Sequence, residues 1–176
     1  DDIELLGDDG SVIGVLYGVR AQQENLEPRA LSDFVDEHRG VVGLFALTTP
    51  HEDVLSDRDR GDGFLSILVQ GVATALVECA NQSVHRRLFE GMGPYILPAI
   101  GYPICPDHAL KSDVLRLLGA EEIGICLTES QMMVPLASVC GFSIVNPQAV
   151  YYHPGQIGED QRADYARRRR VSPAGR

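Results

Sequence analysis

One stretch of the sequence constrains the chain more than any other: Pro98-Ala99-Ile100-Gly101-Tyr102-Pro103-Ile104-Cys105-Pro106-Asp107-His108. Its three prolines fix φ, and each one pushes the residue before it towards extended geometry. The stretch therefore predicts a pre-ordered loop that holds a tyrosine, a cysteine and an Asp-His pair in fixed directions. Taken alone, it is also consistent with a structural elbow between two elements.

Several shorter motifs follow this loop along the chain. They are Leu127-Thr128-Glu129-Ser130, Val134–Gly141, Tyr151-Tyr152, Gly155–Gly158 and Asp160–Arg168. In this order and spacing, the chain resembles the C-terminal activation domain of cobalamin-dependent methionine synthase over nearly its whole length. That family typically reads G-Y-P-A-C-P, L-T-E-S and D-Y-A-R-R at three of these places. Several motifs in one order form a far more specific signal than any one of them.

The resemblance implies that S-adenosylmethionine binds at the loop and at the tyrosine pair. The positions that carry over as cofactor-binding residues are Leu97, Ala99, Gly101, Tyr102, Tyr151 and Tyr152. A glycine lets the backbone approach a ligand, and a tyrosine face can meet a sulfonium or an adenine. The alternative is that the tyrosines anchor the fold through their hydroxyls. We expect the 97–103 loop and the tyrosine pair to line the main pocket together.

The resemblance also implies an activity and partners. In this family the domain presents the methyl group of S-adenosylmethionine to an oxidised cobalamin, while a reductase supplies the electron. The sequence has no D-x-H-x-x-G cobalamin motif, so a partner, a cobalamin-binding methyltransferase module, is expected to hold the cobalamin. A flavodoxin-like reductase is the second implied partner, and methionine biosynthesis is the implied pathway. Whether the chain itself counts as an enzyme stays open.

The sequence offers no convincing catalytic residue. Asp107-His108 lies beside Cys105, but no third group can be assigned to orient a thiol–imidazole pair. Glu129 is more consistent with structural hydrogen bonds, and nothing in the pattern pairs with His153. The four cysteines show no C-x-x-C spacing. We therefore predict neither catalytic residues nor a metal site.

Three departures from the family pattern favour a second interpretation. Leu97 stands where the family has an arginine, Thr74 where it has a glutamate, and the short connection Glu90–Tyr95 where it has an acidic insertion. The alternative is a repurposed homologue that has lost S-adenosylmethionine and acts as a new small-molecule enzyme or as a docking module. If the rest of the site is intact, Leu97→Arg is expected to raise S-adenosylmethionine affinity about tenfold.

Composition limits the classes of function. A length of 176 residues with 44% hydrophobic content predicts one globular domain over 1–176, with a C-terminal helix and basic tail over 158–176. A net charge of −10 argues against nucleic acid as a partner. Arg167–Arg170 is interpreted as a helix end that suits the helix dipole, followed by a solvated tail. The acidic start does not resemble a signal peptide, and the cysteine pattern suits a reducing compartment, so we expect a cytoplasmic protein.

The hydrophobic pattern predicts an α+β fold. Strands are expected over 3–6, 12–19, 41–48, 123–127 and 139–145, the first two forming a hairpin, and helices over 64–88, 110–118 and 159–170. Because strands cluster rather than alternate with helices, we expect a mostly antiparallel twisted sheet with packed helices. The 64–88 helix should be nearly buried apart from a polar stripe at Gln70, Thr74 and Glu78, and no membrane is expected as a partner. Residues 50–63 are expected to form a loop or a weak helix start.

Overall fold

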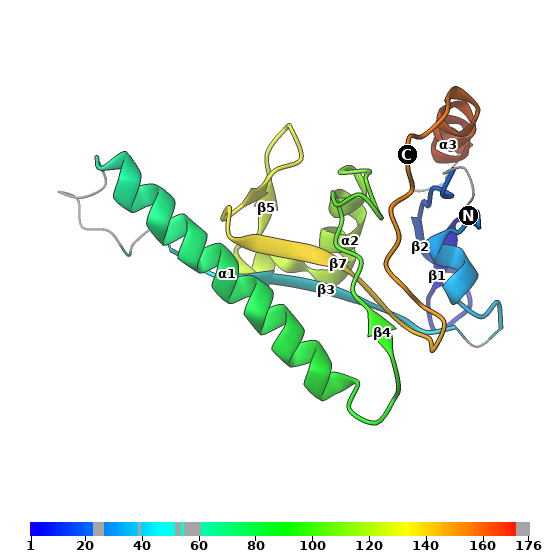
Figure 1. Cartoon of the computed structure of the whole chain (residues 1–176), viewed down its shortest axis with the longest axis horizontal. Helices are drawn as coiled ribbons and strands as arrows, with labels where there is room; N and C mark the ends of the chain where they lie inside the picture. Colours follow the sequence, from blue (N-terminus) through cyan, green and yellow to red (C-terminus); the bar gives the residue numbers. More distant parts are fainter. Residues whose placement is uncertain (23–26, 39, 52–53, 55–60, 172–176) are drawn as a thin grey trace. The chain divides into compact units, whose positions relative to one another are not determined.

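The computed structural model describes residues 1–22, 27–38, 40–51, 54 and 61–171 (Figure 1). Most of the predicted 50–63 loop and the tail over 172–176 therefore lie outside the described residues. The helices are α1 (Gly63–Leu88), α2 (Leu110–Leu118) and α3 (Glu159–Val171). The strands are β1 (Ile3–Leu6), β2 (Val12–Leu16), β3 (Val42–Thr48), β4 (Tyr95–Ile96), β5 (Cys126–Leu127), β6 (Met133–Val134) and β7 (Ser138–Val145). These elements confirm the predicted α+β class.

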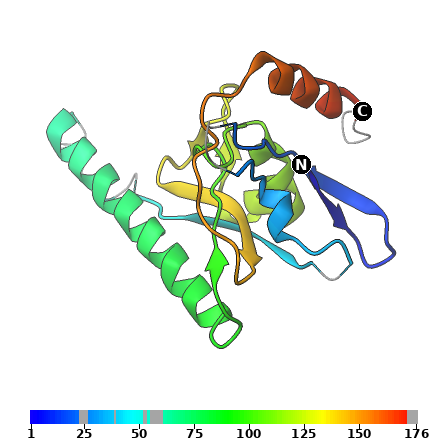
Figure 2. The same cartoon turned by 45° about the vertical axis from the view of Figure 1, so that its right-hand side comes forward.

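The strands form small sheets with antiparallel pairs. The hairpin of β1 and β2 is antiparallel, with Ile3 opposite Leu16, as the sequence predicted (Figure 2). Gly10 lies in its turn at φ +77°, a conformation that glycine adopts without strain. Strand β7 lies between β3 and β4 in a three-stranded sheet, and β4 pairs with it antiparallel. β5 and β6 form a further antiparallel pair.

The contacts divide the chain into two compact units. Unit 1 consists of Asp1–Gly43, Gly93–Leu110 and Phe142–Arg176, and unit 2 of Leu44–Met92 and Lys111–Gly141. Each unit is assembled from segments that are distant in sequence, and β3 and β7 each run from one unit into the other. A single domain over residues 1–176 stays a prediction.

Unit 1 contains the proline-rich loop, and much of that loop is core. Ile100, Ile104 and Cys105 are at most 6% exposed, alongside Phe142 and Ile144 of β7. Burying a side chain of this size stabilises the fold by about 1.5–3 kcal/mol. The loop is therefore an integral part of the core of unit 1 and not a surface linker.

Helix α3 of unit 1 corrects the interpretation of the basic run. Arg168 pairs with Asp2 and with Asp164, and Arg169 pairs with Asp107, so both side chains point into the unit, at 20% and 29% exposure. Arg167 is 75% exposed and pairs along the helix, with Asp164. Two arginines of the run, Arg168 and Arg169, therefore have a structural role, because they form ion pairs with acidic residues outside the helix.

Helix α1 of unit 2 begins where the sequence predicts. The side chain of Asp62 caps it by accepting hydrogen bonds from the amides of Phe64 at 2.9 Å and Leu65 at 3.2 Å. Arg86 and Arg87 occupy the last turn, where cations suit the helix dipole. The predicted 64–88 helix is therefore confirmed.

The expected burial of α1 is wrong. Its buried residues are Ala73, Val77, Asn81 and His85, which recur every four positions. Large apolar side chains along the rest of the helix are exposed, namely Phe64, Ile67, Leu68, Val72, Leu76, Val84 and Leu88. The packed side of the helix thus includes two polar residues, while most of its large apolar side chains face outwards.

The buried side of α1 makes ring contacts through His85. The His85 imidazole lies 4.9 Å from the Phe45 ring and 5.7 Å from the Phe89 ring, measured between centroids. His85 Nδ1–H donates to the Asn81 carbonyl at 2.9 Å, which satisfies one side of the buried ring. Aromatic contacts of this kind contribute about 0.5–1.5 kcal/mol each, and a hydrogen-bonded polar ring costs less to bury than an unpaired one.

Length and composition alone would allow α1 to cross a membrane. The helix has 26 residues, and its most apolar window has a mean hydropathy of 1.7 with 11% of that window buried. Core helices and signal sequences meet the same two criteria. Length and hydropathy alone therefore do not place α1 in a membrane or in a protein core.

Val77→Ala and Val72→Ala test which side of α1 is packed. Val77 is 2% exposed and Val72 is 60% exposed, and both changes remove the same two methyl groups from one helix. We expect Val77→Ala to lower the free energy of unfolding by about 1–3 kcal/mol, because it leaves a cavity. Val72→Ala should change it by less than about 0.5 kcal/mol. Urea denaturation measures both, and equal losses would contradict the observed packing.

Candidate ligand site at the Pro98–His108 loop

The turn of the loop depends on Gly101. Its φ is +97°, and a Cβ atom placed there would lie 2.7 Å from Cε1 of His108. The loop closes through two backbone hydrogen bonds of 2.8 Å, from the Gly101 amide to the Cys105 carbonyl and from the Cys105 amide to the Tyr102 carbonyl. Glycine is therefore needed both for the backbone conformation and for the contact with the imidazole.

The start of the loop is held from both sides. The Leu97 amide donates to the Tyr151 hydroxyl at 2.8 Å, and the Phe142 amide of β7 donates to the Pro98 carbonyl at 3.1 Å. Leu97 and Tyr151 are 54 residues apart, so the expected meeting of the loop with the tyrosine pair is confirmed for these two residues. The Tyr151 hydroxyl also acts as an anchor of the fold, as the alternative interpretation of the tyrosines proposed.

The three tyrosines differ in their surroundings. Tyr102 and Tyr151 are 55% and 60% exposed, so ring surface is available to a ligand at both positions. The Tyr152 ring packs near Phe34, with centroids 6.5 Å apart, and its hydroxyl is buried without a hydrogen-bond partner among the described residues. Burial, followed by the charge of Asp33, raises the pKa of Tyr152 to about 12. The hydroxyl therefore stays protonated and is an unused donor.

A cation that the sequence analysis missed lies in this part of unit 1. Arg20 forms ion pairs of 2.7 Å with Asp33 and with Asp1, and its charge also acts on Tyr152. The hydrogen bond from Arg20 holds the pKa of Asp33 below its usual value. No sequence signal identified Arg20, because its partners are brought together only by the fold. Since two carboxylates already neutralise it, Arg20 does not simply replace the family arginine.

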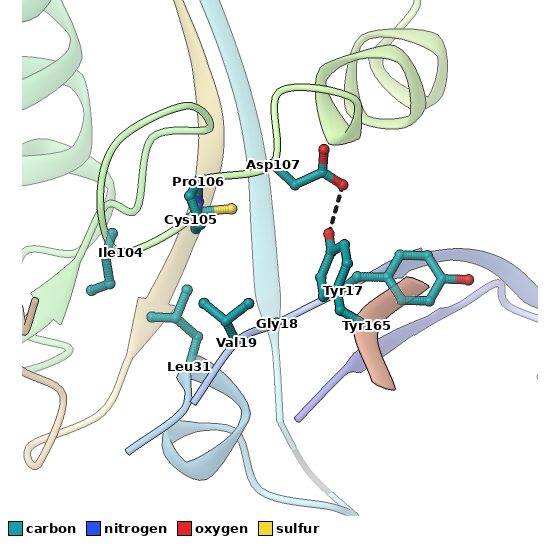
Figure 3. Close-up of a pocket in the computed structure, with 9 residues that line it drawn as sticks. All are labelled: Tyr17, Gly18, Val19, Leu31, Ile104, Cys105, Pro106, Asp107 and Tyr165. Atoms are coloured by element: carbon teal, nitrogen blue, oxygen red, sulfur yellow. Dashed lines mark hydrogen bonds between the residues drawn. The ribbon is translucent and has the colours of Figure 1, made fainter. Parts of the chain in front are cut away.

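A cavity lies at the far end of the loop. Its volume is about 80 Å³, and Tyr17, Leu31, Cys105, Asp107 and Tyr165 are among the residues that line it (Figure 3). It includes none of the six residues predicted to bind S-adenosylmethionine. Pockets for ligands of drug size usually measure about 300–1,000 Å³, so this cavity cannot hold S-adenosylmethionine. The binding of S-adenosylmethionine by the six predicted residues stays a prediction.

Two candidate chemical groups in the loop, the Asp107 carboxylate and the His108 ring, already make contacts within unit 1. The Asp107 carboxylate accepts hydrogen bonds from the Tyr165 hydroxyl at 2.6 Å and from Arg169 at 2.7 Å. The His108 ring packs against the Gly101 backbone. Among the described residues, no group of three or more His, Cys, Asp and Glu side chains could hold a metal ion. The arrangement suits binding and positioning better than acid–base chemistry.

The burial of Leu97 predicts a stability cost for Leu97→Arg, while the expected gain in ligand affinity stays a prediction. Its side chain is 6% exposed, so Leu97→Arg would place a guanidinium in the core of unit 1. We expect the free energy of unfolding to fall by about 3 kcal/mol or more, because a buried charge without a partner is strongly destabilising. The matched control is Leu6→Arg at a 59% exposed position, which should change stability by less than about 0.5 kcal/mol. If Leu97→Arg is as stable as the parent and binds S-adenosylmethionine more tightly, the expected gain in affinity is confirmed.

Gly101→Ala tests the turn against a matched glycine. Gly91 has a similar φ of +78°, but a Cβ atom placed there would have no neighbour within 4 Å, so Gly91→Ala measures the backbone strain alone. That strain costs about 1–3 kcal/mol. We expect Gly101→Ala to cost more than Gly91→Ala, and the double variant Gly101→Ala/His108→Ala to recover the difference. Denaturation of the parent and these three variants measures this, and equal costs at the two glycines would contradict the contact.

Comparisons with known proteins found a matching family model and a similar solved structure. Residues 88–170 match the family described as vitamin B12 dependent methionine synthase, activation domain. Among solved structures, the chain is similar to the MetH reactivation domain bound to AdoHcy, with 32% sequence identity and a TM-score of 0.84. The match covers 97% of this chain and 62% of that chain, so this chain spans less than two thirds of that protein's length. In sequence over residues 88–170 and in fold over nearly its whole length, the chain is similar to the vitamin B12 dependent methionine synthase activation domain.

Proposed function

We propose that this domain binds S-adenosylmethionine at the loop and tyrosine pair and presents it to a cobalamin held by a partner module. The observation that carries the proposal is the hydrogen bond between the Leu97 amide and the Tyr151 hydroxyl. It joins the loop that bears Gly101 and Tyr102 to the Tyr151-Tyr152 pair. The related MetH reactivation domain was solved bound to AdoHcy, the demethylated form of this ligand.

The residues present fit part of such a ligand. The exposed rings of Tyr102 and Tyr151 offer faces to a sulfonium or an adenine. Gly101 keeps the backbone accessible at the turn. The cation that the resemblance implies for the amino-acid carboxylate is replaced by the apolar Leu97, and the nearby Arg20 is already paired with two carboxylates. The proposed site therefore predicts weaker binding than a site that has the family arginine.

The domain contributes positioning in this proposal. Bound S-adenosylmethionine would supply its methyl group to reduced cobalamin and leave S-adenosylhomocysteine, with the reducing electron coming from a flavodoxin-like reductase. The chain's own residues would bind the ligand and orient its sulfonium. The partner is a cobalamin-binding methyltransferase module, and the setting is cytoplasmic methionine biosynthesis.

A second function is favoured by the burial of Leu97. A leucine that is 6% exposed is packed in the core of unit 1, and this burial favours the loss of the ligand contact that the resemblance implies for the arginine at this position. Thr74, where the family has a glutamate, removes a further polar contact. A repurposed homologue that serves as a docking module or acts on another small molecule would have both features.

Titration calorimetry with S-adenosylmethionine and with AdoHcy separates the two functions. We expect weak, saturable binding by the parent protein and loss of that binding in Tyr102→Ala, because the ring supplies a stacking face. The control is Phe64→Ala, which truncates another exposed aromatic ring, 70% exposed, on α1. It should bind like the parent. Absence of binding at millimolar ligand would reject the first function and favour the repurposed homologue.

A further inference from the structure

The Asp107 carboxylate connects the loop to helix α3. Its Oδ2 accepts a hydrogen bond from the Tyr165 hydroxyl at 2.6 Å (Figure 3). Oδ2 also accepts from Arg169 Nη1 at 2.7 Å, and Oδ1 accepts from the Ala109 amide at 2.9 Å. Arg169 also lies over the Tyr17 ring, 5.2 Å from its centroid. These five residues form one cluster, which we call the Asp107 cluster.

Polar contacts hold α3 in place. Besides the Asp107 cluster, Gln161 is buried and forms two hydrogen bonds with the backbone of Arg20, at 2.6 Å and 3.0 Å. Arg168 donates to the Gly18 carbonyl and pairs with Asp2. Charge-assisted hydrogen bonds of this kind are stronger than neutral ones and depend on geometry. The docking of α3 is therefore specific and depends on a few identifiable groups.

The Asp107 cluster lies one residue away from the contact that supports the turn. His108 follows Asp107 directly, and its ring packs against Gly101. Pro106 precedes Asp107 and restricts the backbone there. A displacement of Asp107 therefore moves His108, and with it the surface on which the Gly101–Tyr102 turn rests.

The cavity explains why these contacts matter for the loop. It borders Ile104, Cys105, Pro106 and Asp107, so this part of the loop is incompletely packed on that side. A void forfeits the dispersion contacts that would otherwise hold a segment in place. The hydrogen bonds to Asp107 accordingly carry more of the restraint than they would in a filled core.

We propose that α3 sets the position of the Gly101–Tyr102 turn through Asp107, which makes Tyr165 and Arg169 positioning residues for the ligand site. The inference rests on the proposed function for its consequence, since the turn carries two of the predicted ligand residues. Its structural part, the coupling of α3 to the turn, stands on the contacts of unit 1 alone.

Tyr165→Phe is the main test, because the phenyl ring keeps its edge-on contact with Tyr17 while the hydrogen bond to Asp107 is lost. Hydrogen exchange of the Gly101 and Cys105 amides, which close the turn, should become about tenfold faster. Arg169→Gln should act in the same direction. The matched control is Arg167→Gln, since Arg167 pairs with Asp164 on its own helix, and it should leave these amides unchanged.

Two outcomes would overturn the coupling. One is unchanged exchange of the Gly101 and Cys105 amides in Tyr165→Phe. The other is an equal acceleration at the Ile96 and Ile144 amides, since that would show general destabilisation of unit 1 and not control of the turn. The exchange experiment needs no ligand, so it judges the coupling even if the proposed function fails.

AdoHcy titration tests the consequence for the site. If the parent protein binds AdoHcy, Tyr165→Phe should weaken the binding several-fold at a temperature where the variant is fully folded, and Arg167→Gln should not. Unchanged affinity together with faster exchange would overturn the positioning role. A parent protein that binds no AdoHcy would reject the proposed function and leave the coupling to the exchange result.

Discussion

The hydrogen bond from the Leu97 amide to the Tyr151 hydroxyl is the constraint on which the candidate site depends. It joins two segments that are 54 residues apart, and it does so through a backbone donor that no substitution of Leu97 other than proline removes. With Pro98 held on β7 by the Phe142 amide, the loop leaves the core in a fixed direction. Gly101 can then turn the chain back against His108, so that Tyr102 is presented on the surface.

Ion pairs between arginines and acidic residues connect segments of unit 1, and the net charge of the chain does not indicate them. The chain is acidic overall, yet Arg20, Arg168 and Arg169 all lie inside networks of carboxylates and backbone carbonyls. Half-buried pairs of this kind are screened less than exposed ones and hold their partners in a defined geometry. The acidic residues near the N-terminus and in the loop thus act as acceptors for cations that would otherwise be solvated.

Helix α1 shows the opposite relation between sequence and packing. Its composition is apolar, but the side that packs contains Asn81 and His85, and the His85 ring contacts Phe45 and Phe89. A stripe of polar residues on a helix is usually taken to mark the exposed side. The predicted stripe at Gln70, Thr74 and Glu78 is indeed not buried, but most of the large apolar side chains outside it are exposed as well. The side that packs is a different one, where His85 contacts Phe45 of strand β3.

The sequence by itself determined several elements, the hairpin and the resemblance to the activation domain. Prolines, glycines and apolar runs act over a few residues, so the bounds of β1, β7, α1 and α3 could be predicted closely. Only the tertiary structure decided that Leu97 is buried, that the Tyr152 hydroxyl has no partner in the described part of the chain, and that α3 reaches Asp107. These features arise from contacts between segments that are distant in sequence. No local pattern encodes them, because each depends on where another part of the chain lies.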